Sequence, residues 1–92
     1  MGYIVEFSRK AKEHISAYEK AGNKKALAKI DRIIEDLEVH PKTGIGKPKK
    51  LKNYPKERWS RRIDEKNRMT YEIKEYIVTV SVISAMGHYD DK

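Results

Sequence analysis

The chain has 92 residues, a formal net charge of +7, and equal shares of charged and hydrophobic residues, 38% each. This length predicts one domain, spanning residues 1–92, with a modest core and no room for an enclosed cofactor. The absence of cysteine excludes disulfides, thiolate nucleophiles and Cys-ligated zinc. The sequence has no signal-peptide pattern and no apolar run of membrane-spanning length, so we expect an intracellular, cytoplasmic protein without a membrane partner.

The first half of the chain predicts a strand followed by two helices. Tyr3–Phe7 is β-branched and aromatic, which is typical of a strand. Ser8 is suited to cap a helix that stops at Gly22-Asn23. Apolar residues at helical spacing predict a second helix that ends at His40-Pro41. The short link between the two helices predicts an antiparallel helical hairpin.

The second half predicts a loop and then an antiparallel sheet, so the fold class is α+β. Residues 42–55 are rich in glycine, proline and lysine and predict a loop, with a short strand possible near Lys50–Lys52. Three further strands are expected, at Trp59–Ile63, Arg68–Ile73 and Tyr76–Met86.

The lengths of the two turns decide which side chains share a face of this sheet. A three-residue turn at 65–67 would pair Arg62 with Thr70 and would place Arg62 and Arg68 together on the exposed face. Trp59 would then face the core, so we interpret it as structural. A two-residue turn at 74–75 would pair Tyr71 with Val78.

All of the surplus charge lies between Lys47 and Arg68. This segment holds ten basic and three acidic residues, a net charge of +7, whereas the other 70 residues hold eleven of each. Unbalanced charge slightly disfavours a compact state, so the asymmetry indicates a polyanionic partner, with nucleic acid as the first candidate. We expect the following side chains to contact RNA: Lys47, Lys50, Lys52, Lys56, Arg58 and Arg61.

The residues available for chemistry are arginine, lysine, histidine and tyrosine. The histidines lack metal-ligand spacing and no phosphate-binding glycine loop is present, so we expect no metal and no cofactor. His88 follows Gly87 directly after the last predicted strand, and histidine is suited to proton transfer near neutral pH. This set is suited to metal-free RNA cleavage, in which the 2′-hydroxyl of the RNA attacks the neighbouring phosphorus.

Five short strings contain the distinctive residues of the chain. They are Gly44-Ile45-Gly46-Lys47-Pro48, Lys50-Leu51-Lys52, Trp59-Ser60-Arg61-Arg62-Ile63, Asn67-Arg68-Met69-Thr70-Tyr71 and His88-Tyr89. Together they resemble the YoeB (Txe) branch of the RelE-type bacterial toxins over essentially the whole chain. The resemblance implies a RelE-like α+β fold and a toxin of a toxin–antitoxin module. Such toxins enter the ribosomal A site and cut messenger RNA, and a cognate antitoxin neutralises them. A homodimer remains an open alternative.

The resemblance also implies roles for individual residues. Arg62 and Arg68 match the arginines that contact the scissile phosphate, His88 matches the general acid, and Tyr89 matches a tyrosine that shapes the site and stacks on a base. The remaining basic residues of the segment would bind the ribosome. One position departs from the family, because Lys49 stands where YoeB-like toxins have a glutamate proposed as the general base.

Lys49 leaves several functions open. As a cation it could stabilise the phosphorane or the attacking oxygen, and as a base it could accept the proton of the 2′-hydroxyl. The first alternative to cleavage is an attenuated homologue that binds ribosome, RNA or antitoxin without efficient cleavage. The second is a general basic RNA- or DNA-binding domain. We therefore expect an endoribonuclease whose catalytic residues are Lys49, Arg62, Arg68, His88 and Tyr89.

Overall fold

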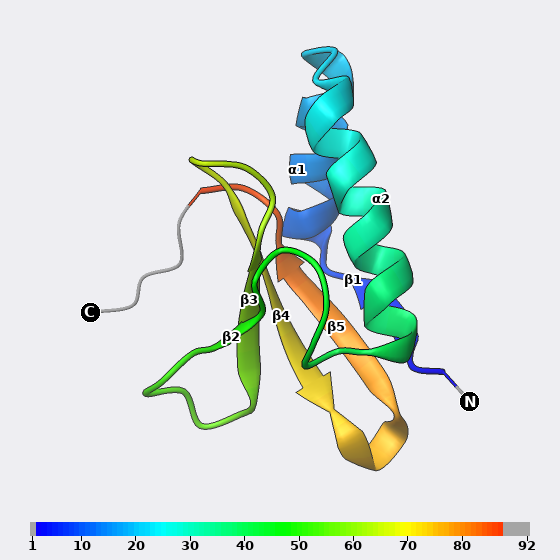
Figure 1. Ribbon diagram of the computed structural model, residues 1–92, viewed down its shortest axis with the longest axis vertical. Coiled ribbons are helices and arrows are strands. Elements are labelled where there is room, and N and C mark those ends of the chain that lie inside the picture. Colours follow the sequence, from blue (N-terminus) through cyan, green and yellow to red (C-terminus); the bar gives the residue numbers. More distant parts are fainter. Residues whose placement is uncertain (1, 88–92) are drawn as a thin grey trace.

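The computed structural model describes residues 2–87, in which two helices cover one face of a five-stranded sheet (Figure 1). The elements in chain order are β1 (Ile4–Phe7), α1 (Arg9–Lys20), α2 (Lys24–Val39), β2 (Lys49–Lys50), β3 (Arg58–Arg62), β4 (Arg68–Lys74), the 3₁₀ turn η1 (Glu75–Ile77) and β5 (Thr79–Ser84). The strand order is β1-β5-β4-β3-β2, and β1 lies parallel to β5 while the other neighbours are antiparallel. The predicted α+β fold is confirmed.

The helical hairpin is capped by side chains. The Ser8 Oγ accepts a hydrogen bond from the Ala11 N–H at 3.0 Å and so begins α1. Asn23 begins α2 in the same way, because its Oδ1 accepts from the Ala26 N–H at 3.1 Å. Gly22 lies between the helices with a φ of 67°, a value that glycine adopts without strain. These contacts confirm the predicted helix boundaries near Ser8 and Gly22-Asn23.

The core lies between the helices and one face of the sheet, and the opposite sheet face is polar. The core residues of α2 recur at helical spacing: Ala26, Ile30, Ile33 and Leu37. They pack on alternate residues of the central strands: Met69, Tyr71, Ile73, Val80 and Val82. Neither helix of the described region combines the length and hydrophobicity needed to span a membrane.

The turn between β3 and β4 is longer than predicted. Arg62 lies opposite Arg68 and Trp59 opposite Tyr71, so the predicted pairing of Arg62 with Thr70 is wrong by two residues. The cause is Asp64, whose Oδ1 accepts hydrogen bonds from the backbone N–H groups of Lys66 and Asn67 and folds residues 63–67 into the turn. A shift of two residues keeps each side chain on its predicted face, so the placement of Arg62 and Arg68 on one face is confirmed.

The turn between β4 and β5 also differs from the prediction. Lys74 pairs with Thr79, so the turn holds four residues rather than two, and β5 begins at Thr79 instead of Tyr76. Tyr71 consequently lies opposite Val82, and the predicted pairing with Val78 is wrong. The prediction of a strand from Tyr76 is wrong, because the first three residues of the apolar run lie in an exposed turn. The short strand expected near Lys50–Lys52 is present at Lys49–Lys50.

Candidate functional site

The sheet face opposite the helices carries rows of polar residues. Directly paired residues share a face, and one row across the sheet runs Lys49, Ser60, Thr70 and Ser84. Arg62 and Arg68 form the next row toward the β3–β4 turn. The Ser60 Oγ is completely buried and has no hydrogen-bond partner in the described part of the chain. This face has the polar and cationic groups that an anionic ligand requires.

Arg62 and Arg68 are directly opposed across β3 and β4. Like charges in this position destabilise a sheet, because the side chains lie close together. Elsewhere on the same two strands, Arg58 is paired with the opposite charge of Glu72. The Arg62 side chain has no hydrogen-bond or ion-pair partner among residues 2–87. An arginine pair with this arrangement is suited to an anion, such as a phosphate, that accepts hydrogen bonds from both side chains.

Lys49 lies beside the arginine pair. It pairs with Ser60, so Lys49 and Arg62 are diagonal neighbours on one face, a relation that places Cα atoms about 7–8 Å apart. Lys49 is exposed, whereas Arg62 and Arg68 are half-buried. The structure therefore brings together three of the five predicted catalytic residues: Lys49, Arg62 and Arg68.

His88 and Tyr89 lie outside the described residues, but the backbone that leads to them is held firmly. The Gly87 N–H donates to the Asn67 Oδ1 and the Gly87 carbonyl accepts from the Arg68 N–H, both at 2.9 Å. Two residues earlier, the Ala85 N–H donates to the His14 Nδ1 at 3.1 Å and the Ala85 carbonyl accepts from the Tyr18 hydroxyl at 2.7 Å. The residue that precedes His88 is thus fixed next to the backbone of Arg68.

The Tyr18 hydroxyl is a stable part of this anchor. Burial raises the pKa of Tyr18 to about 12, with a smaller effect from the negative charge of Asp64. The phenol therefore stays protonated and continues to donate to the Ala85 carbonyl throughout the neutral range.

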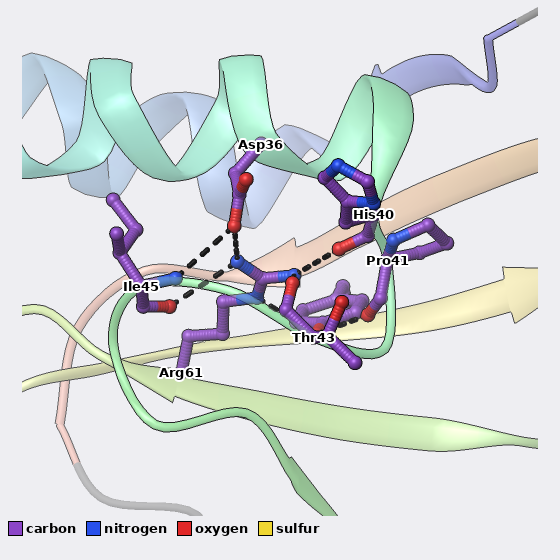
Figure 2. Close-up of polar contacts among 7 residues, drawn as sticks. Asp36, His40, Pro41, Thr43, Ile45 and Arg61 are labelled. Atoms are coloured by element: carbon purple, nitrogen blue, oxygen red, sulfur yellow. Dashed lines mark hydrogen bonds and ion pairs between the residues drawn. The ribbon is translucent and has the colours of Figure 1, made fainter.

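Arg61, which precedes Arg62, points into the protein and has a different role (Figure 2). Its Nη1 donates to the Asp36 carboxylate at 2.5 Å and to the Ile45 carbonyl at 3.2 Å. Its Nη2 donates to the Thr43 carbonyl at 2.9 Å and also to the His40 carbonyl. The Arg61 Nε donates to the Tyr71 hydroxyl at 3.1 Å. Every N–H of the guanidinium can therefore be satisfied internally.

This cluster fixes the loop that leads to Lys49. The Tyr71 hydroxyl, whose pKa is raised by burial and lowered less by Arg61, stays protonated and donates to the Pro41 carbonyl at 2.7 Å. The Ile45 N–H donates to the Asp36 Oδ2 at 3.1 Å. Gly44 has a φ of 123°, and a Cβ on it would lie 1.7 Å from that same oxygen. The prediction that Arg61 binds RNA is wrong, because its side chain is 0% exposed and fully engaged.

The other predicted RNA-binding residues lie around the same edge of the sheet without forming one cluster. Lys50 pairs with Trp59 and therefore faces away from Lys49. Lys56 lies 3.9 Å from Glu72, and the Arg58 guanidinium lies 4.7 Å from the centre of the Tyr54 ring. Four of these side chains are exposed: Lys47, Lys50, Lys52 and Lys56.

Two carboxylates near the arginines in sequence, Glu57 and Asp64, have structural partners. Glu57 accepts from the Trp59 Nε1 at 3.1 Å and pairs with Lys42. Burial tends to raise the pKa of Asp64, but hydrogen bonds from Asn67 and from the Lys66 backbone hold that pKa below its ordinary value. Trp59 packs against the core, as predicted. Within residues 2–87, no group of three or more histidine and acidic side chains is arranged to hold a metal ion.

Solved structures place this fold in a known class. The YoeB/ParE toxin from Agrobacterium tumefaciens superposes with a TM-score of 0.85 at 24% identity, and the match covers 94% of this chain and 99% of that one. The toxin in the YoeB–YefM complex from Staphylococcus aureus superposes with a TM-score of 0.79 at 30% identity and with coverage of 95% and 98%. A YoeB dimer from the same species gives 0.82 at 28% identity. The fold is that of the RelE-type and YoeB-type toxins.

Sequence comparisons identify the family within this class. Residues 7–89 match a family model described as YoeB-like toxin of bacterial type II toxin–antitoxin system. Toxin RelK of Mycobacterium tuberculosis is 36% identical over 69 residues, covering 75% of this chain and 79% of that protein. Toxin YoeB of Streptomyces coelicolor is 36% identical over 67 residues, covering 73% and 77%. The chain belongs to the YoeB family of toxins of type II toxin–antitoxin systems.

Proposed function

We propose that this toxin is a ribosome-dependent endoribonuclease that cleaves messenger RNA without a metal ion. The observation that carries this proposal is the direct opposition of Arg62 and Arg68 on the open sheet face. Two arginines on one phosphate would neutralise the charge that develops on the phosphorane. The other side of the sheet is covered by helices, which leaves this face for the substrate.

The proposed reaction divides its steps among five residues. The 2′-hydroxyl of the RNA attacks the adjacent phosphorus, the bond to the 5′-oxygen breaks, and a cyclic phosphate and a 5′-hydroxyl form. Arg62 and Arg68 hold the phosphate, and Lys49 stabilises the attacking oxygen or accepts its proton. His88 donates a proton to the departing 5′-oxygen, and Tyr89 aligns the base.

The partners follow from this reaction and from the relatives. The exposed lysines of residues 47–56 would contact the RNA of the ribosomal A site in the cytoplasm. A cognate antitoxin would neutralise the toxin, as suggested by the YoeB–YefM complex of the S. aureus relative. The dimer of that relative makes a homodimer a reasonable form of the free protein.

Primer extension on messenger RNA from expressing cells tests the proposal. We expect breaks within codons after induction of the parent chain, and no breaks for the double variant Arg62→Gln/Arg68→Gln. Lys12→Gln removes an equivalent exposed charge from α1 and should cleave like the parent. Intact messenger RNA in cells arrested by the parent chain would overturn cleavage as the function.

Lys49 favours one second candidate, a toxin that occupies the ribosome and cleaves poorly. The motive is the lysine in place of the family glutamate, since two carboxylates near the arginines, Glu57 and Asp64, already have structural partners. This candidate predicts arrested translation with few cut ends, and a gain of cleavage in Lys49→Glu. A loss of cleavage in Lys49→Glu would exclude it.

A further inference from the structure

The charges of α2 are separated in space although the chain outside residues 47–68 is neutral by count. Three basic residues recur at helical spacing and form one stripe: Lys25, Lys29 and Arg32. Three acidic residues with the same spacing form a different stripe: Asp31, Glu35 and Glu38. The basic stripe adjoins the core-facing side of the helix on the flank toward the β3–β4 turn, where its members line a groove with residues of that turn.

This groove has a volume of about 370 Å³ and lies between α2 and the β3–β4 turn. The basic stripe forms one wall, and Ile63 and Asp64 form the other. Ala26 and Ile63, which are 3% and 5% exposed, form its apolar base. A second hollow on the same turn is lined by Lys25, Asp64, Glu65 and Lys66.

Three cations face one carboxylate in the groove between α2 and the turn, so its lining favours an anion. The carboxylate belongs to Asp64, whose Oδ1 already accepts from the N–H groups of Lys66 and Asn67. Those hydrogen bonds spread its negative charge over the turn and leave less of it to repel a ligand. The lining contains no aromatic residue on which a base could stack, so the groove is suited to a phosphate backbone rather than to bases.

The groove and the arginine pair adjoin the same turn from opposite faces of the sheet. Ile63 directly follows Arg62, and Asn67 directly precedes Arg68, so the turn of residues 63–67 joins the two surfaces. Resting on the proposed function, we infer that the groove binds the phosphate backbone of the same single-stranded RNA, beyond the scissile phosphate. The strand would pass from the arginine pair around the turn to α2. Lys25, Lys29 and Arg32 would each contact a phosphate.

Binding of uncleavable 2′-O-methyl RNA tests the inference. A tetranucleotide should reach only the arginine pair, whereas a dodecanucleotide should also reach the groove. We expect Lys25→Gln/Lys29→Gln/Arg32→Gln to weaken binding of the dodecanucleotide alone. The slope of log K against log salt should fall by about two, because each phosphate contact on a single strand contributes about 0.7. The matched variant Lys10→Gln/Lys12→Gln/Lys20→Gln, which changes exposed residues of α1, should keep the parent slope.

Two outcomes would overturn the groove as an RNA site. One is that the Lys25→Gln/Lys29→Gln/Arg32→Gln variant binds the dodecanucleotide with the affinity and the salt slope of the parent. The other is an equal loss in both triple variants, which would reflect net charge alone. If the groove variant binds RNA like the parent but binds the antitoxin more weakly, the first outcome holds. The groove would then be a site for a protein partner. Since the oligonucleotides cannot be cleaved, a failure of catalysis leaves this test intact. Conversely, tetranucleotide binding that depends on Arg62 would support the arginine site even if the groove fails.

Discussion

Arg61 and Arg62 are adjacent arginines on β3, but their side chains lie on opposite faces of the sheet. The Arg61 side chain is 0% exposed and binds the Asp36 carboxylate, three loop carbonyls and the Tyr71 hydroxyl. Arg62 lies on the open face opposite Arg68. The period of two along a strand explains the difference, since adjacent side chains point to opposite faces. The buried structural arginine and the arginine that we propose to bind phosphate thus occupy consecutive positions.

Substitution by methionine should separate these two roles. Arg61→Met leaves the Asp36 carboxylate and the loop carbonyls without their donors, so the free energy of unfolding should fall by about 3–5 kcal/mol. Arg62→Met removes a half-buried like-charge contact and no hydrogen bond among residues 2–87, so the free energy of unfolding should change by less than about 0.5 kcal/mol. Urea denaturation of both variants measures this. Equal losses would show that Arg61 is not the anchor of the loop.

The sequence contained a signal for the role of Arg61. In the predicted register it already shared a face with Trp59 and Ile63, and only its charge suggested contact with RNA. The period of the strand therefore predicts the environment of Arg61 better than its charge does. The partner Asp36 could not be found in this way, because the pairing depends on how α2 crosses the sheet.

At the scale of elements, the β4–β5 turn shows where apolar patterning misleads. Tyr76, Ile77 and Val78 continue the hydrophobic run of β5, yet they are 82%, 50% and 47% exposed. Val78 is left-handed, with a φ of 49° and a ψ of 50°, which is strained for a β-branched residue. Glu75 holds the turn from outside, through contacts with the Tyr3 hydroxyl and with Lys42. Local sequence patterns do not predict such long-range contacts.

Val78→Gly should relieve this strain and raise the free energy of unfolding by about 1 kcal/mol. Ile77→Gly provides the control, because Ile77 has no positive φ, so the change adds chain entropy and removes a half-exposed side chain, with an expected loss of about 1 kcal/mol. Thermal unfolding of the two variants gives the comparison. A loss in Val78→Gly as large as in Ile77→Gly would mean that the Val78 side chain makes a stabilising contact.

At the scale of the whole molecule, the two ends of the sheet differ in chemistry. The β3–β4 turn carries the arginine pair and the groove of α2, and the β4–β5 turn at the opposite end carries exposed apolar side chains (Figure 1). The residue before His88 is fixed at the cationic end by Asn67 and Arg68. This difference agrees with the proposal that the protein binds RNA through the end that carries the β3–β4 turn.

The order of elements and the face shared by Arg62 and Arg68 could be predicted from sequence, because both depend on local periodicity. The lengths of both turns could not, since they depend on contacts that spacing does not show, such as the hydrogen bond from the Asn67 N–H to Asp64 and the ion pair of Glu75 with Lys42. The basic stripe of α2 was detectable from its spacing, but the neutral charge count of that part of the chain concealed it.

We propose that Arg62, Arg68 and Lys49 form one RNA-cleaving site. Single-turnover cleavage of messenger RNA on programmed ribosomes, with purified parent and variants, tests it most directly. We expect the parent to cut the A-site codon, and Arg62→Gln or Arg68→Gln to slow cleavage by about 100- to 1,000-fold, the usual cost of losing one donor to a developing anion. Lys12→Gln should leave the rate unchanged. Absence of cleavage by the parent, or undiminished cleavage by either arginine variant, would contradict the claim.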